Sequence, residues 1–111
     1  MKQLGQELRR RREANGIGLR ELARYTDLSP SYLSRIETGD EQSPPSEEAI
    51  VGLHRFLGGD LGELLQLAGR IPSDVRALLL ADAGLITFLR SARERGLTSA
   101  DLVRMVSGVK P

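Results

Sequence analysis

Two short amphipathic helices, joined by a turn of about three residues, are predicted by the stretch from Leu19 to Ile36. In the first helix, apolar or small side chains recur at the i, i+3, i+4, i+7 spacing of a single helix face. These residues are Leu19, Leu22, Ala23 and Thr26. Ala23 has its own reason to be small, because two helices that cross steeply after so short a turn need a small side chain at their closest approach. The rest of the chain is interpreted as what holds these two helices in place.

The second helix begins with several independent signals. Ser29 is the expected N-cap, because its hydroxyl can accept a hydrogen bond from a free backbone N–H of the first turn. Pro30 follows at the first helical position, where a missing N–H costs little. Leu28, before the cap, is placed to pack against Leu33 as a hydrophobic staple. The direction in which the chain enters this helix is therefore fixed locally.

The second helix has an apolar face and a polar face. A step of about 100° per residue from Pro30 puts Leu33 and Ile36 on the inner face. The outer face carries Ser31, Ser34, Arg35 and Thr38. Small residues let a helix approach another surface closely, and the planar guanidinium of an arginine suits the O6 and N7 atoms of guanine. Such a face fits a DNA groove.

At these residues the chain resembles the helix-turn-helix family of phage repressors, Cro proteins and bacterial XRE-type regulators. The resemblance runs through Gly16-Ile17, Glu21-Leu22-Ala23, Leu28-Ser29-Pro30-Ser31-Tyr32-Leu33-Ser34-Arg35-Ile36-Glu37 and Gly39. It covers roughly residues 3 to 68 and implies an all-α fold with a five-helix repressor-like bundle. It also implies that the second helix is the recognition helix, with Ser31 and Arg35 at base-reading positions. Arg12 and Glu37 are implied to form an internal salt bridge.

In the mechanism that this resemblance implies, the segment from Pro30 to Thr38 enters the major groove, with Ser31 and Arg35 against base edges. The amino ends of the flanking helices, together with Arg20 or Arg24, would hold phosphates. The full set of candidate DNA-binding residues is Ser29, Ser31, Tyr32, Ser34, Arg35, Thr38, Arg20 and Arg24. For each of these residues ordinary solvent exposure is the alternative.

Three positions depart from the family pattern. Asp27 stands in the turn where Gly is usual, although Asp tolerates the left-handed conformation better than most residues. Leu19 stands where a phosphate-contacting Gln is common. The loop after Gly39 is longer than usual and begins Asp40-Glu41 where Lys or Arg is common. The last two departures remove expected contacts with the DNA backbone.

Composition narrows the class of protein. The chain has 111 residues and a formal net charge of +1, with no Cys. This length fits one domain with an appended element, and the absence of Cys excludes disulfides and favours a reducing, cytoplasmic setting. The chain begins without the apolar core of a signal peptide, and no apolar run approaches the roughly eighteen residues of a membrane helix. We therefore expect a soluble cytoplasmic protein.

The first helix of the bundle is predicted from Lys2 to about Ala14, with Leu4 and Leu8 facing inward. Arg12 lies one turn further along that side, where a partly buried charge must be paired. It belongs to the run RRRR at positions 9 to 12, which is read first as a solvated helix face. Four consecutive residues spread around a helix, so they cannot all face one partner.

Two more helices complete the predicted bundle. Ser46 caps the first of them, which ends at Gly58-Gly59. Its inward residues are Ile50, Leu53 and Leu57. Asp60, with Glu63 three residues later, resembles a capping box at the start of a short helix that Gly69 closes. Residues 1 to 70 are therefore expected to form the DNA-binding domain.

Residues 71 to 111 are expected to form a helical extension of three helices. The first opens at Pro72-Ser73-Asp74, the second at Asp82 or Ala83, and the third is capped by Thr98. Forty residues are too few for an independent hydrophobic core, so these helices must bury their apolar side chains elsewhere. The candidates are the back of the bundle, the same segment of a second subunit, or an unrelated protein. Dimerisation is favoured, because one short recognition helix with few basic neighbours binds DNA weakly.

The leading functional prediction is a sequence-specific DNA-binding transcriptional regulator, repressor-like, which binds operator DNA as a dimer. The alternative is an antitoxin or antirepressor in which the bundle presents a surface to another polypeptide. An enzyme is not expected, because the chain has a single His, His54, and neither a glycine-rich phosphate loop nor metal-ligand spacing. No catalytic residue, metal site or cofactor is predicted.

Overall fold

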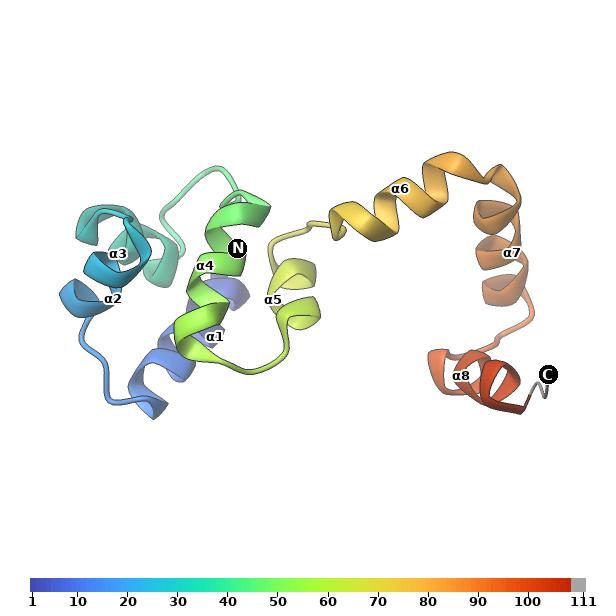
Figure 1. The fold of residues 1–111 in the computed structure, drawn as a ribbon, viewed down its shortest axis with the longest axis horizontal. Helices are drawn as coiled ribbons and strands as arrows, with labels where there is room; N and C mark the ends of the chain where they lie inside the picture. Colours follow the sequence, from blue (N-terminus) through green and yellow to red (C-terminus); the bar gives the residue numbers. More distant parts are fainter. Residues whose placement is uncertain (109–111) are drawn as a thin grey trace. The chain divides into compact units, whose positions relative to one another are not determined.

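The computed structural model describes residues 1–108, and in that range every regular element is an α-helix. The helices are α1 (Lys2–Ala14), α2 (Leu19–Thr26), α3 (Pro30–Thr38), α4 (Glu47–Leu57), α5 (Leu61–Leu67), α6 (Ser73–Ala81), α7 (Ala83–Glu94) and α8 (Ser99–Gly108). The all-α prediction is confirmed. The chain divides into two compact units, Met1–Pro72 with α1 to α5 and Ser73–Pro111 with α6 to α8 (Figure 1). The last three residues of the predicted extension, 109–111, lie outside the described range.

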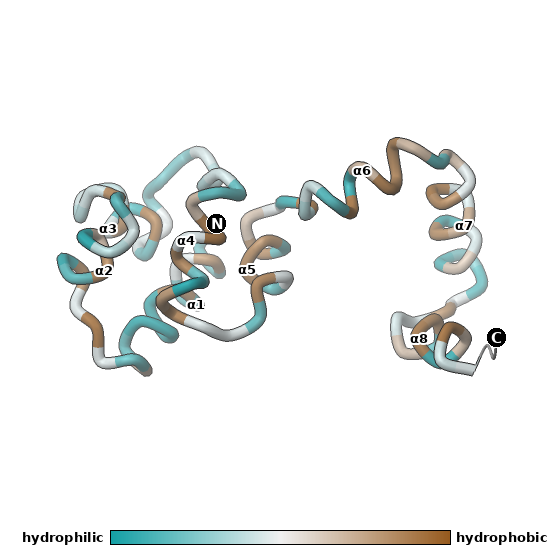
Figure 2. The backbone as a smooth tube through the Cα atoms, in the orientation of Figure 1, coloured by the Kyte–Doolittle hydropathy of each residue, from teal (hydrophilic) through white to brown (hydrophobic). Residues whose placement is uncertain are grey.

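Helices α1 to α5 enclose a single hydrophobic core. Its buried side chains are Leu4, Leu8, Leu22, Ala23, Leu33, Ile36, Ile50, Leu53, Leu57, Leu64, Leu65 and Ala68. The inward residues expected for α1, α3 and α4 are among these residues, and so are Leu22 and Ala23 of α2. Leu19 and Thr26, expected on the same face of α2, are only half-buried. Hydrophobic stretches of the backbone alternate with hydrophilic ones along these helices (Figure 2). The core therefore holds α2 and α3 against the other three helices.

Close packing of α1 against α3 depends on Gly5. This residue is buried, and a Cβ atom added to it would lie 2.2 Å from the carbonyl oxygen of Ile36 and 2.5 Å from that of Glu37. Both oxygens belong to the backbone of α3, which no rotamer change can move away. The absence of a side chain at this position therefore sets the distance between the two helices.

Side-chain caps define the starts of α3, α4 and α5. Ser29 Oγ accepts a hydrogen bond from Tyr32 N at 3.1 Å, and Ser46 Oγ accepts one from Ala49 N at 3.1 Å, as predicted. The capping box predicted at Asp60 is different. Asp60 Oδ1 accepts from Gly62 N at 2.9 Å, whereas Glu63 lies 3.7 Å from a guanidinium nitrogen of Arg11. Glu63 thus forms an ion pair that links α5 to α1, and does not cap its own helix.

The second unit leaves much of its apolar surface exposed. Asp82 caps α7 by accepting from Gly84 N at 2.9 Å, and Thr98 Oγ1 at the start of α8 accepts from Asp101 N at 3.2 Å. Within residues 73–108, only Ala92 is buried. Large exposed side chains in this unit are Val75, Leu78, Leu80, Leu85, Phe88, Leu89, Leu97, Val103, Met105 and Val106.

Residues 1–108 contain no helix long and apolar enough to cross a bilayer.

Candidate nucleic-acid interface

The turn between α2 and α3 occupies residues 27–29 and is built by local bonds. Asp27 adopts the left-handed conformation, with φ 58° and ψ 28°, and is the one non-glycine residue with positive φ among residues 1–108. Leu28 N donates to the carbonyl of Ala23 at 3.2 Å, which closes the end of α2. Asp therefore takes the left-handed conformation that Gly usually supplies in such a turn, as expected from its tolerance of that conformation.

The outer face of α3 is open to solvent. Leu33 and Ile36 are 2% and 1% exposed, whereas Ser31, Ser34, Arg35 and Thr38 all belong to the exposed class. This separation follows from the helical period, because the two core residues occupy one side of a helix of only nine residues. The outer-face residues form a continuous polar strip, which we call the α3 strip: Ser31, Ser34, Arg35 and Thr38.

The other predicted site residues on α3 have structural contacts of their own. Ser29 is exposed, but its hydroxyl oxygen already accepts the capping bond from Tyr32 N. Tyr32 is half-buried and packs against the core, with its ring centroid 5.9 Å from Arg35 Cζ. Burial, and then the nearby charge of Glu41, raise the pKa of the Tyr32 hydroxyl. Tyr32 therefore lies at the margin of the α3 strip and supports Arg35.

Acidic residues of the following loop contact the α3 strip. Arg35 Nε lies 2.9 Å from Glu41 Oε2, and Thr38 Oγ1 donates to Asp40 Oδ2 at 2.9 Å. The sequence showed these two acids only as a departure from a basic pattern, and their pairing with the strip was missed. The signal was the reversal of charge just after Gly39, which turns the chain back with φ 85°.

Arg20 and Arg24 lie exposed beside the turn. An open hollow is lined by Arg20, Ala23, Arg24, Asp27, Leu28, Ser29 and Pro30. It brings the two guanidinium groups of α2 near the amino end of α3. Positive charge and a helix amino end are both favourable for a bound anion. The structure thus places the two arginines predicted to bind phosphates around a hollow at the amino end of α3.

An ion pair between Arg12 and Glu37 joins α1 to the end of α3. Arg12 Nε lies 2.7 Å from Glu37 Oε2, and Arg12 Nη2 donates to Glu37 Oε1 at 2.9 Å. The side chains are 15% and 9% exposed, and Arg12 Nη1 also donates to the carbonyl of Ile17 at 3.0 Å. Hydrogen bonding to Glu37 is the main cause that raises the pKa of Arg12. The structure therefore contains the salt bridge that the family resemblance implied.

We expect Glu37→Ala to destabilise the protein by about 2 kcal/mol, because it leaves the largely buried Arg12 guanidinium without its carboxylate. Glu13→Ala is the matched control, since Glu13 pairs with Arg9 at 2.7 Å on the surface, with side chains 65% and 59% exposed. That control should change stability by less than about 0.5 kcal/mol. Urea unfolding of the three proteins measures both effects. A Glu37→Ala protein as stable as the control would contradict this account.

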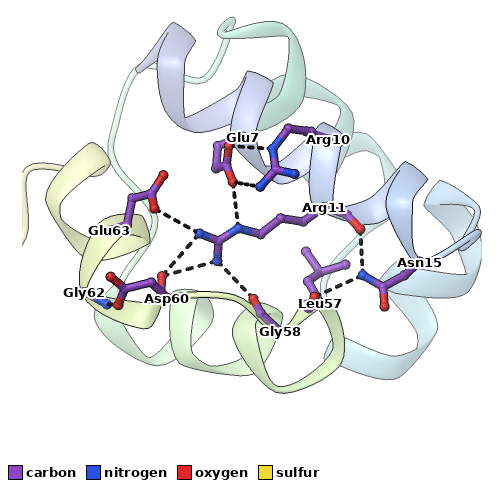
Figure 3. Close-up of polar contacts among 9 residues, drawn as sticks. All are labelled: Glu7, Arg10, Arg11, Asn15, Leu57, Gly58, Asp60, Gly62 and Glu63. Carbon is purple, nitrogen blue, oxygen red and sulfur yellow. Dashed lines mark hydrogen bonds and ion pairs between the residues drawn. The ribbon is translucent and has the colours of Figure 1, made fainter.

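Arg11 is buried at 4% exposure, a position that its place in a basic run did not predict. Its Nε lies 2.8 Å from Glu7 Oε1, and Nη1 donates to the carbonyls of Gly58 at 3.0 Å and Asp60 at 3.3 Å (Figure 3). Arg11 thus joins α1 to the loop between α4 and α5. In the run RRRR only Arg9 and Arg10 have the exposed position expected for the whole run.

The Glu7 carboxylate gives this network a pH dependence. Hydrogen bonds from Arg10 and then Arg11 lower the pKa of Glu7 from 4.5 to about 2. Because the folded-state pKa is depressed, the stabilisation is complete above the unfolded value and is lost as the pH falls toward the folded value. We expect Glu7→Gln to cost about 1 to 2 kcal/mol at pH 6 and less than half of that at pH 2.5. Chemical unfolding at both pH values checks this, and an equal cost at both would contradict it.

Comparison with known proteins agrees with this geometry. Residues 3–68 match the family described as helix-turn-helix domain. Among solved structures, the chain is similar to one in the SinR protein/SinI protein complex, with a TM-score of 0.52 and 23% sequence identity. The match covers 94% of this chain and 91% of that chain, and at this identity it shows a shared fold. No curated protein matches the sequence. The resemblance found in the sequence is confirmed: the chain belongs to the helix-turn-helix domain family.

Proposed function

We propose that this protein is a sequence-specific DNA-binding transcriptional regulator, repressor-like, which acts in the cytoplasm and binds operator DNA as a homodimer. The observation that carries the proposal is the α3 strip. A short helix places Leu33 and Ile36 in the core and turns a face of two serines, a threonine and an arginine to solvent. In the helix-turn-helix family such a face enters the major groove of DNA.

Each group on this surface has a role in the proposed complex. Ser31 and Arg35 meet base edges, and Arg35 supplies the paired donors that suit guanine. Ser34 and Thr38 lie against bases or phosphates beside them. Arg20 and Arg24 bind the DNA backbone, because their charges lie beside the hollow at the amino end of α3. Ser29 and Tyr32 contribute at the margin of the surface, where they shape the start of α3.

The second unit supports the homodimer. Leu80 and Val106 are 78% and 76% exposed within the single chain, and other apolar residues of α6 to α8 are exposed as well. Apolar surface of this extent is characteristic of an interface. A two-fold axis would place two α3 helices about 34 Å apart, one turn of the duplex, so that their binding free energies nearly add.

Selection of bound sequences from random duplexes tests the proposal. We expect enrichment of a palindrome whose half-sites are centred about one helical turn apart, 10 to 10.5 base pairs. Light scattering should give a dimer for the full chain and a monomer for a chain ending at residue 72. Bound duplexes with no shared sequence would contradict sequence-specific regulation, and a monomeric full chain on DNA would contradict the dimer.

A second candidate is a protein-interaction module of the antitoxin or antirepressor type. It is favoured by the same exposed apolar residues of α6 to α8, and by the similar solved structure, which is a complex of two proteins, SinR and SinI. In this case a different polypeptide would bind residues 71 to 111. A stoichiometric complex that dissociates the homodimer through this segment would support the second candidate.

A further inference from the structure

We propose that Glu41 is a positioning residue for DNA recognition, which orients the guanidinium of Arg35 so that its two terminal amino groups face a guanine. The inference rests on the proposed function and adds the residue that prepares Arg35 for its base. Arg35 is 51% exposed at its side chain, and the side chain of Glu41 is 20% exposed. The acid is therefore the better anchored member of the pair.

The loop after α3 fixes the position of Glu41 relative to Arg35. Asp40 N and Glu41 N both donate to the backbone carbonyl of Arg35, at 2.9 Å and 3.1 Å. The chain reaches this arrangement through Gly39, whose left-handed conformation closes α3. Glu41 thus binds Arg35 through the backbone and through the side chain at once. Because the backbone of Glu41 is bonded to that of Arg35, the Glu41 carboxylate stays within reach of the arginine side chain.

The guanidinium is also supported from a second direction. Arg35 Cζ lies 5.9 Å from the centroid of the Tyr32 ring, which is itself packed against the core. An arginine over an aromatic ring is stabilised by the charge distribution of the ring. Tyr32 and Glu41 therefore restrict the same planar group from two sides.

Within residues 1–108, only one donor nitrogen of the Arg35 side chain makes a hydrogen bond to another residue. In this bond Nε donates to Glu41 Oε2, at 2.9 Å. The terminal nitrogens Nη1 and Nη2 remain for a ligand. Two parallel donors match the O6 and N7 acceptors of guanine in the major groove. A carboxylate on Nε thus orients the arginine without occupying the donors that would read the base.

The negative charge of Glu41 has a second, opposite effect on binding. An acid near the duplex weakens attraction to phosphates, and that attraction is largely independent of base sequence. Orientation of Arg35, in contrast, acts on the specific complex alone. The two effects can be distinguished by the specificity ratio, which is the affinity for the selected operator divided by the affinity for a scrambled duplex. Glu48 provides the control for charge, since it is also a glutamate and is exposed in the first turn of α4, outside the α3 strip.

The experiment compares Glu41→Ala, Glu41→Gln and Glu48→Ala with the parent on both duplexes at one salt concentration. Ordering a flexible side chain before binding raises affinity by about two- to tenfold. Glu41→Ala should therefore lower the specificity ratio by that factor. Glu41→Gln should lie between it and the parent, because an amide oxygen still accepts from Nε. Glu48→Ala should leave the ratio within about twofold of the parent value. In an Arg35→Ala background, Glu41→Ala should have no further effect on the ratio.

A measurement without DNA separates this inference from the proposed function. In nuclear magnetic resonance spectra of the free protein, the Nε–H signal of Arg35 should be protected from exchange and should lose that protection in Glu41→Ala. An unprotected signal in the parent would overturn the inference, whatever the DNA results. A specificity ratio raised by Glu41→Ala would overturn it too and would make Glu41 a competitor of the operator. A parent that selects no sequence would overturn the proposed function and this inference together.

Discussion

Gly5→Ala is expected to destabilise the first unit by about 3 kcal/mol, the largest stability change that we anticipate from a single methyl group in this chain. The added Cβ would lie 2.2 Å from the carbonyl oxygen of Ile36, so α1 must move away from α3. At about 4 to 8 °C per kcal/mol for a domain of this size, Tm should fall by about 12 to 24 °C. Thermal unfolding followed by circular dichroism measures the change.

Gly52→Ala is the matched control for this substitution. Gly52 lies inside α4, and a Cβ atom at this position meets nothing within 4 Å. Ala is the better helix former, so the control should melt at or above the parent, with a gain of up to about 1 kcal/mol. If both variants melt alike, the close approach of α1 and α3 does not exist in solution.

Arg35→Ala should weaken binding to the selected operator by about ten- to a hundredfold, which corresponds to the loss of one bidentate contact with guanine. Arg35 is exposed and contributes no side chain to the core, so Tm should stay close to that of the parent. Fluorescence anisotropy with operator and scrambled duplexes measures the affinities. Binding to the scrambled duplex should fall much less, since that complex depends on charge alone.

Arg55→Ala is the control for the loss of charge. Arg55 is exposed in the last turn of α4 and carries the same charge as Arg35 outside the proposed interface. Arg55→Ala should weaken binding to the operator and to the scrambled duplex by the same small factor. Equal operator binding by Arg35→Ala and the parent would refute the assignment of Arg35.

Local features of this fold could be read from the sequence. The start of α3 follows from Ser29 and Pro30, because a cap and a fixed φ act within a few residues of themselves. The inward faces of α1 to α4 follow from helical periodicity, and the same periodicity identifies the outer face of α3. Asp27 could be recognised as a residue in a left-handed turn because the family has Gly there.

Features that depend on distant partners could not be read in the same way. Gly5 shows no local signal, since its role depends on carbonyls that lie more than thirty residues later in α3. Arg11 looks like its neighbours in a basic run, and only the return of the loop after α4 gives it carbonyl partners. Glu41 shows in sequence as an unfavourable charge, and its bond to Arg35 requires the turn at Gly39.

Sensitivity of the complex to methylation of guanine N7 is the most direct test of how the α3 strip meets DNA. N7 lies in the major groove, so methylation of the guanine opposite Arg35 should block binding of the parent to the selected operator. Arg35→Ala, measured at a higher protein concentration, should be indifferent to that same methyl group. Binding that tolerates N7 methylation at every guanine, and is blocked by methylation of adenine N3 in the minor groove, would contradict the account.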